Sequence, residues 1–420
     1  MADARSLCPS AASIAIVATL DTKGPEVSFV RDLLLQIGRP VLVIDVGTSD
    51  APGISGDVTR AEVEKQGGGE AAFTRSGGPA AALTVMAAGA KAVATRLQAE
   101  GRIRAVIGIA GGKGSALFKE AVADLPFGFP KVLVSSARPQ LLASFAETTD
   151  IALFPTLVDL FGVNDFTERV LRNAGAAVAA MEWRKPPDHR RKVVGVTAFG
   201  VTTAAVSQCV ALLKAAGVEP IAFPANGAGG RLMERLVLAG EIDAVLDLTI
   251  TELADEIAGG SASAGPDRLT AAGMTGVPHL VAPGAVDMIN FGPRTQVPQK
   301  FEGRLFYQHT PHTTLVRTDV DENRRIGMMA GRQLAMGRGK LTVLFPSGGF
   351  SDYDRPGQPF FDPAADQAFL DGLRATLPKR ADLRVVDCHI NDPHFARAAV
   401  DWILATLSIS EKAVDGQEVL

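Results

Sequence analysis

The residues whose types and spacing could do chemistry gather first in Ile107–Leu117, IGIAGGKGSAL. An apolar segment, predicted to be a strand, runs into the glycines, lysine and serine of Gly111–Ser115, and we predict that a helix opens at Ser115. Glycine lets the backbone approach a ligand closely, and the first N–H groups of a helix attract anions. The segment is not a Walker loop, because Gly114 separates the lysine from the serine, and no G-x-G-x-x-G occurs. A tight turn that packs a helix on a sheet is the alternative.

Two further polar segments follow predicted strands of the first half. Ser13–Thr19 is a continuous apolar run and leads into LDTKGP, which carries Thr22 and Lys23. Pro40–Asp45 is a second run, and it ends at Asp45 in a long loop. Doubly wound folds often place an acid there that binds a ribose hydroxyl. An acid in a solvated turn is the alternative interpretation.

The second half carries its own glycine turn and a pair of acids. Asn226–Arg231, NGAGGR, is a glycine turn that opens a helix, and its arginine is suited to an anion. Glu252 and Asp255 lie three apart and share one face of a predicted helix. They are candidate catalytic residues, although such a face is more often solvated.

Three more candidate catalytic residues come later in the chain. Asp287 follows a predicted strand, and Arg317 lies in a strand-like segment, either as an anion clamp or as a buried ion-pair partner. His309 is three residues from His312, beside a proline. The two histidines could ligate a metal, although spacing identifies no third ligand. His309 could instead be an acid, a base, a substrate contact or a structural residue.

Composition restricts the class of protein. The chain has 420 residues, 47% hydrophobic and 21% charged, with a formal net charge of −4. This length predicts two domains, and the charge indicates no nucleic-acid-binding surface. The three cysteines are far apart, no apolar run approaches the roughly 18 residues of a membrane span, and the first residues lack a signal peptide's apolar region. We therefore expect a cytoplasmic protein that does not interact with membranes.

The order of predicted elements gives the fold class, α/β. Strands and helices alternate, and polar or glycine loops follow the strands, which is typical of doubly wound parallel sheets. Residues 183–192 contain two prolines and a cluster of charge, and the same alternation restarts after them. We predict two Rossmann-like domains, 1–182 and 193–420, joined by the linker 183–192, with an active-site cleft between them.

Many segments, in this order, resemble the Tm-one-like ATP-binding domain family over nearly the whole chain. The resemblance is densest in the segments IVATLDTKGPE, VIDVG, GIAGGKGS, VDLFGVND, FGVTT, GAGGRLMERLVLAG, VLDLTITELADE, SAGPDRLTAAG, GAVDMINFGP and PSGGFSDYDRPGQPFFDPAAD. It implies two Rossmann-like subdomains, a homodimer, and ATP with magnesium bound in the first subdomain.

The chain also departs from the family pattern at three loops. GGKGS stands where the family has GGSGGT, SSARPQ stands where it has a Ser-Thr-Met-Ala-Ser-Gly run, and PANGAGG replaces a His-Ala-Thr-Gly-Thr-Gly-Gly run. These departures alter both predicted ligand crevices, so either the mode of nucleotide binding or the substrate could differ from the family's.

Three functions follow as hypotheses. The first is ATP binding in domain one, with Lys23 or Lys113 neutralising phosphate, Asp45 and Gly47 beside the sugar, and Asp21 as a magnesium ligand or a helix cap. Its other binding residues are Thr22, Gly111, Gly112, Gly114, Ser115 and Ser135. The second is an enzyme that acts on a small carboxylate or phosphorylated metabolite in the cleft. It would bind the substrate through Asn226, Gly227, Gly229, Gly230 and Arg231. The third is a non-catalytic, nucleotide-dependent regulator of a protein partner.

Overall fold

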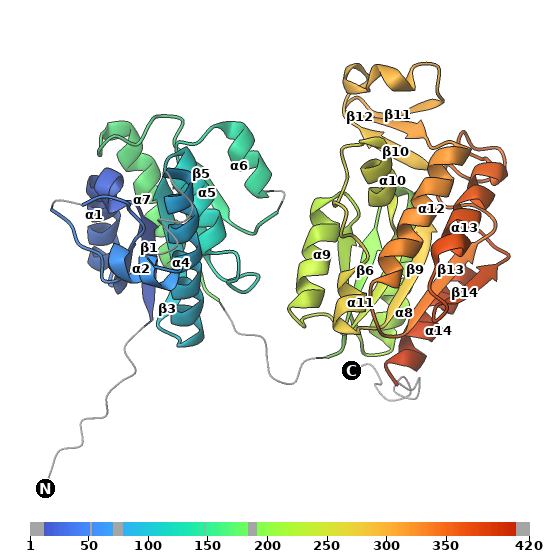
Figure 1. Cartoon of the computed structure of the whole chain (residues 1–420), viewed down its shortest axis with the longest axis horizontal. Helices are drawn as coiled ribbons and strands as arrows, with labels where there is room; N and C mark the ends of the chain where they lie inside the picture. Colours follow the sequence, from blue (N-terminus) through green and yellow to red (C-terminus); the bar gives the residue numbers. More distant parts are fainter. Residues whose placement is uncertain (1–11, 51–52, 70–78, 147, 184–190, 409–420) are drawn as a thin grey trace, which may run out of the picture. The chain divides into compact units, whose positions relative to one another are not determined.

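We describe a computed structural model of the chain over residues 12–50, 53–69, 79–146, 148–183 and 191–408. It divides into two compact units, Met1–Pro186 and Pro187–Leu420, and each is described by itself (Figure 1). The predicted linker falls mainly on residues 184–190, which lie outside the described residues. Each unit contains a parallel sheet with helices on both faces, so the predicted α/β class is confirmed.

The described residues of the N-terminal unit form a five-stranded parallel sheet in the order β2-β1-β3-β4-β5. Its strands are short apolar runs, buried on both faces except at the edge strand β5, as parallel strands require. They are β1 (Ser13–Ala18), β2 (Val41–Asp45), β3 (Ile103–Ala110), β4 (Lys131–Ser135) and β5 (Ala152–Pro155).

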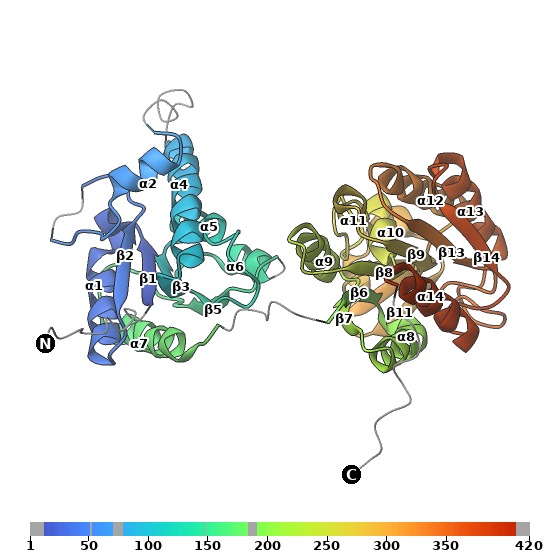
Figure 2. The same cartoon turned by 90° about the horizontal axis from the view of Figure 1, so that it is seen from below.

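Helices cover the two faces of this sheet. One core layer forms beneath α1 and α7, and the other beneath α2, α4, α5 and α6 (Figure 2). The helices are α1 (Leu20–Gln36), α2 (Arg60–Gln66), α4 (Pro79–Ala99), α5 (Gly112–Ala121), α6 (Pro139–Ala146) and α7 (Asp165–Ala180). A capping box at Asn164 fixes the start of α7, where the Asn164 side chain accepts the N–H of Thr167.

Two helices begin earlier than the sequence pattern predicted. The pattern after LDTKGP predicts a helix from about Pro25, but α1 begins at Leu20 and contains a kink at Lys23, so Pro25 lies inside it. The second was expected at Ser115, but α5 begins at Gly112. Glycine has a poor helix propensity, so the glycines of GGKGS favoured a later helix start in the sequence-based prediction. Glycine is nevertheless tolerated in the first turn of a helix, where the N–H groups have no helical partner.

The C-terminal unit has a six-stranded parallel sheet in the order β14-β13-β9-β8-β6-β7. Helices α8 and α14 pack on one face, and α9 to α13 pack on the other (Figure 2). The strands are β6 (Val193–Ala198), β7 (Glu219–Pro224), β8 (Ala244–Thr249), β9 (His279–Gly284), β13 (Leu341–Pro346) and β14 (Asp382–Val386). The helices are α8 (Thr203–Ala215), α9 (Ala228–Leu238), α10 (Thr251–Ala258), α11 (Ala271–Thr275), α12 (Val320–Ala335), α13 (Pro363–Thr376) and α14 (Pro393–Thr406).

A small antiparallel sheet, which the sequence pattern did not predict, caps one end of this unit (Figure 1). Its order is β10-β12-β11, with β10 (Met288–Phe291), β11 (Phe306–Thr310) and β12 (Thr313–Arg317). Three short 3₁₀ helices complete the described elements: η1 (Gly200–Thr202), η2 (Arg294–Gln296) and η3 (Gln299–Phe301). Among the residues described here, no helix is both long and apolar enough to cross a bilayer.

Candidate functional site

The sheet order of the N-terminal unit identifies where a ligand would bind. The chain leaves β1 for β2 on one side and continues through β3 to β4 and β5 on the other, so the topological switch point lies between β1 and β3. Val17 of β1 pairs with Gly108 of β3, which brings the loops after these two strands side by side. Open parallel sheets bind ligands at this point, beyond the carboxyl ends of the strands.

The glycine turn after β3 presents unpaired backbone N–H groups. Gly111 is extended and precedes α5, and within the described residues the N–H groups of Gly112, Lys113 and Gly114 find no hydrogen-bond acceptor. A Cβ atom added at Gly112 would have no atom within 4 Å, so space is open above the turn. The positive end of the helix dipole also lies there, so the turn favours an anion.

The predicted ligand residues Ser115 and Ser135 lie beneath this turn. Both are buried, and their hydroxyl oxygens lie 2.7 Å apart. The Ser115 hydroxyl also donates to the Gly111 carbonyl at 2.8 Å, while Ser135 accepts the N–H of Ala137. These bonds fix the shape of the turn. Lys113 is exposed and lines a groove between α4 and α5.

Lys23 lies beside the switch point, but its ammonium group is already hydrogen-bonded within the protein. The ammonium group is buried, donates to the carbonyl of Leu160, and lies 5.9 Å from the centre of the Phe161 ring. Lys23 therefore anchors the loop after β5. Thr22 is exposed beside it and lines a pocket of about 280 Å³ with Asp21.

Asp45 and Asp21 join the loops after β1 and β2. One oxygen of buried Asp45 accepts the N–H groups of Leu20 at 3.2 Å and of Gly47 at 2.8 Å. Asp21 Oδ2 accepts two N–H groups of the β2 loop, whereas its Oδ1 is buried and has no partner among the described residues. No cluster of three metal-ligating side chains occurs in the part of the chain described. A single carboxylate does suit Mg²⁺ that is held mainly by phosphate oxygens and water.

In the C-terminal unit, the predicted substrate loop is braced by Glu252. Gly227 has a φ of 86°, which favours glycine, and its N–H donates to the Glu252 carboxylate at 2.9 Å. Asn226 accepts the N–H of Gly229, and a Cβ added at Gly230 would lie 2.3 Å from Glu252. Arg231 donates to the carbonyl of Ser263 at 2.8 Å, so it holds a neighbouring loop.

Glu252 belongs to a buried charge network that the sequence pattern did not reveal. Arg268 is 1% exposed and pairs with Asp247, with Glu252 (2.6 Å) and with Glu234 (2.9 Å). His279 contacts Asp247 at 2.8 Å. Because Arg268 satisfies three carboxylates, this network is a structural brace between the sheet and α9, α10 and the loop before α11.

Asp255 lies on α10 with Glu252, and both are fully buried, so the alternative of a solvated helical face is wrong. Asp255 accepts the N–H groups of Ala262 at 2.6 Å and of Asn290 at 2.8 Å. Burial raises the pKa of Asp255 to about 7 against the lowering effect of these bonds. The carboxyl therefore ties β10 to the loop after α10.

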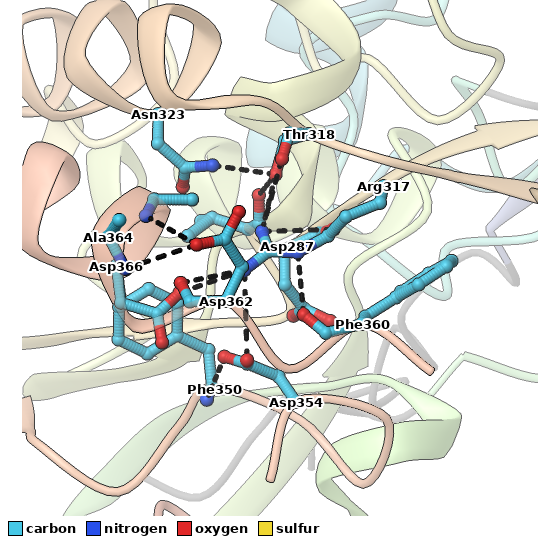
Figure 3. Close-up of polar contacts among 12 residues, drawn as sticks. Asp287, Arg317, Thr318, Asn323, Phe350, Asp354, Phe360, Asp362, Ala364 and Asp366 are labelled. Carbon is cyan, nitrogen blue, oxygen red and sulfur yellow. Dashed lines mark hydrogen bonds and ion pairs between the residues drawn. The ribbon is translucent and has the colours of Figure 1, made fainter. Parts of the chain in front are cut away.

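Asp287 and Arg317 meet in a cluster of three buried acids around one guanidinium group (Figure 3). Arg317 lies 3.0 Å from Asp366 and 3.7 Å from Asp354, and it donates to the carbonyl of Phe360 at 2.7 Å. The buried ion-pair alternative for Arg317 therefore describes its position. Asp287 Oδ2 accepts the Ser351 hydroxyl at 2.7 Å, and its Oδ1 has no partner in the part of the chain described.

One arginine can balance only one of three carboxylates, so burial favours the protonated form of the others. Burial, reinforced by the neighbouring charge of Asp354, raises the pKa of Asp287 to about 7 and that of Asp366 to about 9. Burial also raises the pKa of Asp354. The cluster joins β10, β12 and the loop before α13 to the sheet. We assign it a structural role with a strong pH dependence.

The two candidate histidines lie on the small sheet. The His309 side chain contacts Tyr353, whose hydroxyl oxygen lies 2.8 Å from His309 Nδ1. His312 lies in the hairpin turn between β11 and β12. Both are exposed and line one pocket with Asn226 and Asn290. The pocket belongs to the C-terminal unit alone. Of the predicted substrate and catalytic residues, the structure brings only Asn226 and His309 to it.

The fold and these loops define a class, that of two-domain α/β proteins with Rossmann-like parallel sheets. Models of the uncharacterised protein family UPF0261 match residues 12–186 with their N-terminal domain and residues 191–407 with their C-terminal domain. The chain therefore belongs to the UPF0261 family.

Relatives are similar in sequence to this chain over nearly their whole length or over part of it. A UPF0261 protein of Mesorhizobium japonicum is 38% identical over 93% of this chain and 98% of its own. One from Clostridium tetani is 36% identical over 92% of this chain and 96% of its own. The tomato ToMV resistance protein Tm-1(GCR237) is 38% identical over 73% of this chain and 42% of its own length. The predicted resemblance to Tm-one-like proteins is confirmed.

Proposed function

We propose that the N-terminal unit binds a nucleotide, ATP, at the switch point between β1 and β3. The observation that carries this proposal is the open glycine turn, where three N–H groups of α5 lack acceptors among the described residues and no side chain fills the space above Gly112. Such a turn holds phosphate oxygens through its N–H groups. In this proposal Ser115 and Ser135 fix the turn, and Lys113 supplies positive charge.

Magnesium would be held by Asp21 together with the phosphate oxygens. The unpartnered Oδ1 of Asp21 supports this role, because a buried carboxylate oxygen favours a cation or a donor. Magnesium would neutralise phosphate charge, which matters here because Lys23 already binds Leu160. The proposal also includes a cytoplasmic location, where ATP is available, and a homodimer, which light scattering on the purified protein would detect.

Thermal unfolding of the full chain with ATP, ADP, GTP or NAD, each with and without Mg²⁺, tests the proposal. A ligand at about 100 times its Kd adds about 2.7 kcal/mol to the free energy of unfolding. We expect a rise in Tm that is largest with ATP and Mg²⁺. Asp21→Asn should remove the effect of Mg²⁺ while retaining weaker binding of ATP alone.

A matched pair of variants tests the site. Gly112→Val places a side chain in the space above the turn, where a Cβ atom has no neighbour within 4 Å, so it should abolish the ATP-dependent shift and leave the unliganded Tm close to wild type. Ala92→Val adds a β-branched side chain at an exposed position of α4 and should retain the shift. Equal shifts in both variants, or no shift with any nucleotide in the wild type, would overturn the proposal.

A further inference from the structure

The C-terminal unit contains its own pocket, of about 490 Å³, at the carboxyl end of its parallel sheet. Residues that follow β6 and β7 line it, together with residues of the small antiparallel sheet β10-β12-β11. The sheet order turns between β6 and β8, so this end of the sheet is also a topological switch point. The position and volume are typical of a site for a small molecule.

The charge of the pocket favours an anion with a single negative charge. Within the described residues its lining includes no Asp, Glu, Lys or Arg, and its titratable side chains are His309 and His312. The N–H groups of Gly200 and Val201, at the start of η1 and α8, have no acceptor within the described residues, and α9 begins beside Asn226. The N-terminal end of the segment formed by η1 and α8 thus presents two N–H donors to the pocket. A phosphate dianion usually recruits arginine or lysine as well, whereas one carboxylate needs only N–H donors.

A buried acceptor indicates a second feature of the ligand. Asn290 is 4% exposed and lines the pocket. Its side-chain amide nitrogen donates to Thr251 at 3.1 Å and to Asp255 at 3.3 Å, which directs the amide. The carbonyl oxygen Oδ1 is left buried and without a partner among the described residues. Such an oxygen requires a donor, and the lack of an acid in the lining favours a hydroxyl over an ammonium group.

The remaining lining supplies apolar contacts and a polar mouth. Phe199, Phe291 and Leu315 can contact a hydrocarbon portion, while exposed His309 is held at the entrance by Tyr353. We infer that this pocket binds a small organic monocarboxylate that carries a hydroxyl group. The carboxylate lies against the N–H groups of Gly200 and Val201, and the hydroxyl donates to Asn290 Oδ1. The inference is independent of ATP binding, because it uses residues of the C-terminal unit alone.

Paired probes test this inference by calorimetry on the full chain without nucleotide. Mandelate and phenylacetate differ only in the hydroxyl group, and phenyl phosphate carries a phosphate in place of the CH2–carboxylate group of phenylacetate. We expect mandelate to bind at least tenfold more tightly than phenylacetate and phenyl phosphate. Equal binding of mandelate and phenylacetate, preference for phenyl phosphate, or no binding of mandelate up to 50 mM (about 100 times a typical submillimolar Kd) would overturn the inference.

Charge variants provide the matched control. Gln296 lies in the lining and is exposed, and Gln299, three residues on, is exposed outside it. Gln296→Glu should weaken mandelate at least fivefold while leaving uncharged mandelamide unaffected, and Gln299→Glu should change neither. Gly200→Val, at a position where an added Cβ atom has no neighbour within 4 Å, should abolish binding of both. Retention of mandelate binding in Gln296→Glu and Gly200→Val contradicts the assigned site.

Discussion

The strongest prediction on stability concerns Asp287, the acid of the Arg317 cluster that has no direct ion pair. Its side chain is fully buried, accepts one hydroxyl, and leaves one oxygen without a partner among the described residues. Asp287→Asn keeps the shape of the side chain and cannot ionise. The variant therefore isolates the free energy of burying this one charge.

The magnitude follows from the difference between the folded and unfolded pKa. Burial first, and then Asp354, raises the pKa of Asp287 from 3.8 to about 7. A raised pKa stabilises the folded state fully below the unfolded value, and this contribution is lost as the pH rises to the folded value. A difference of about 3 units corresponds to about 4 kcal/mol. Because Asp354 and Asp366 share the protons of the cluster, this figure is an upper limit.

Urea unfolding between pH 4.5 and 8.5 measures this effect. The two tryptophans lie in different units, so Trp183→Phe leaves Trp402 as a fluorescent reporter of the C-terminal unit. The free energy of unfolding of Asp287→Asn, relative to wild type, should rise by up to about 3 kcal/mol between pH 4.5 and 8 and then level off, because part of the full effect already lies below pH 4.5. Asp321→Asn, whose side chain is 89% exposed, is the control. A difference that does not change with pH would refute the reasoning.

Three further predictions follow from buried groups. Arg268→Met removes the cation that three carboxylates share and should destabilise the C-terminal unit by about 3 to 5 kcal/mol. Urea unfolding with Trp402 as reporter measures this loss. A change below about 1 kcal/mol would contradict the structural role of the Arg268 network. Ser115→Ala removes the hydrogen bonds beneath the glycine turn and should lower the free energy of unfolding of the N-terminal unit by about 1 kcal/mol. The fluorescence of Trp183 reports this unfolding. An unchanged free energy would count against the role of Ser115 in fixing the turn. The third prediction concerns the cysteines, in a Cys8→Ser background at pH 8. A thiol reagent should modify Cys388 well before Cys209, because burial raises the pKa of Cys209 to about 12. Equal rates of modification would contradict the burial of Cys209.

Much of the fold could be predicted because buried parallel strands have a simple pattern. Continuous apolar runs such as those of β1 and β3 are buried on both faces, and their alternation with helices predicts doubly wound sheets. The small antiparallel sheet was missed because β10 is short and β11 is polar and exposed. Neither strand has the period that distinguishes a strand from a loop.

The candidate site was harder to predict because a charged residue's role depends on partners far away in the chain. Arg317 meets Asp366 across 49 residues, and Lys23 meets the carbonyl of Leu160 across 137. Their residue types suggested that Arg317 and Lys23 bind an anionic ligand, whereas in the structure both side chains bind groups of the protein itself. The glycine turn is different, since its local sequence, GGKGS, predicts a strand-to-helix turn with open N–H groups, although α5 begins at Gly112 and not at Ser115. No local sequence pattern indicated that Arg268 is buried among carboxylates. The only feature of Asn290 visible in the sequence is its position after a predicted strand.

Hydrogen–deuterium exchange of the full chain, with and without ATP and Mg²⁺, tests the central claim most directly. We predict that ATP slows exchange in the peptide that covers the start of α5, Gly112–Ala121, because phosphate oxygens accept the free N–H groups of its first turn. Gly112→Val should remove this protection. Protection confined to the C-terminal unit, or none at the start of α5 under saturating ATP, would contradict the claim.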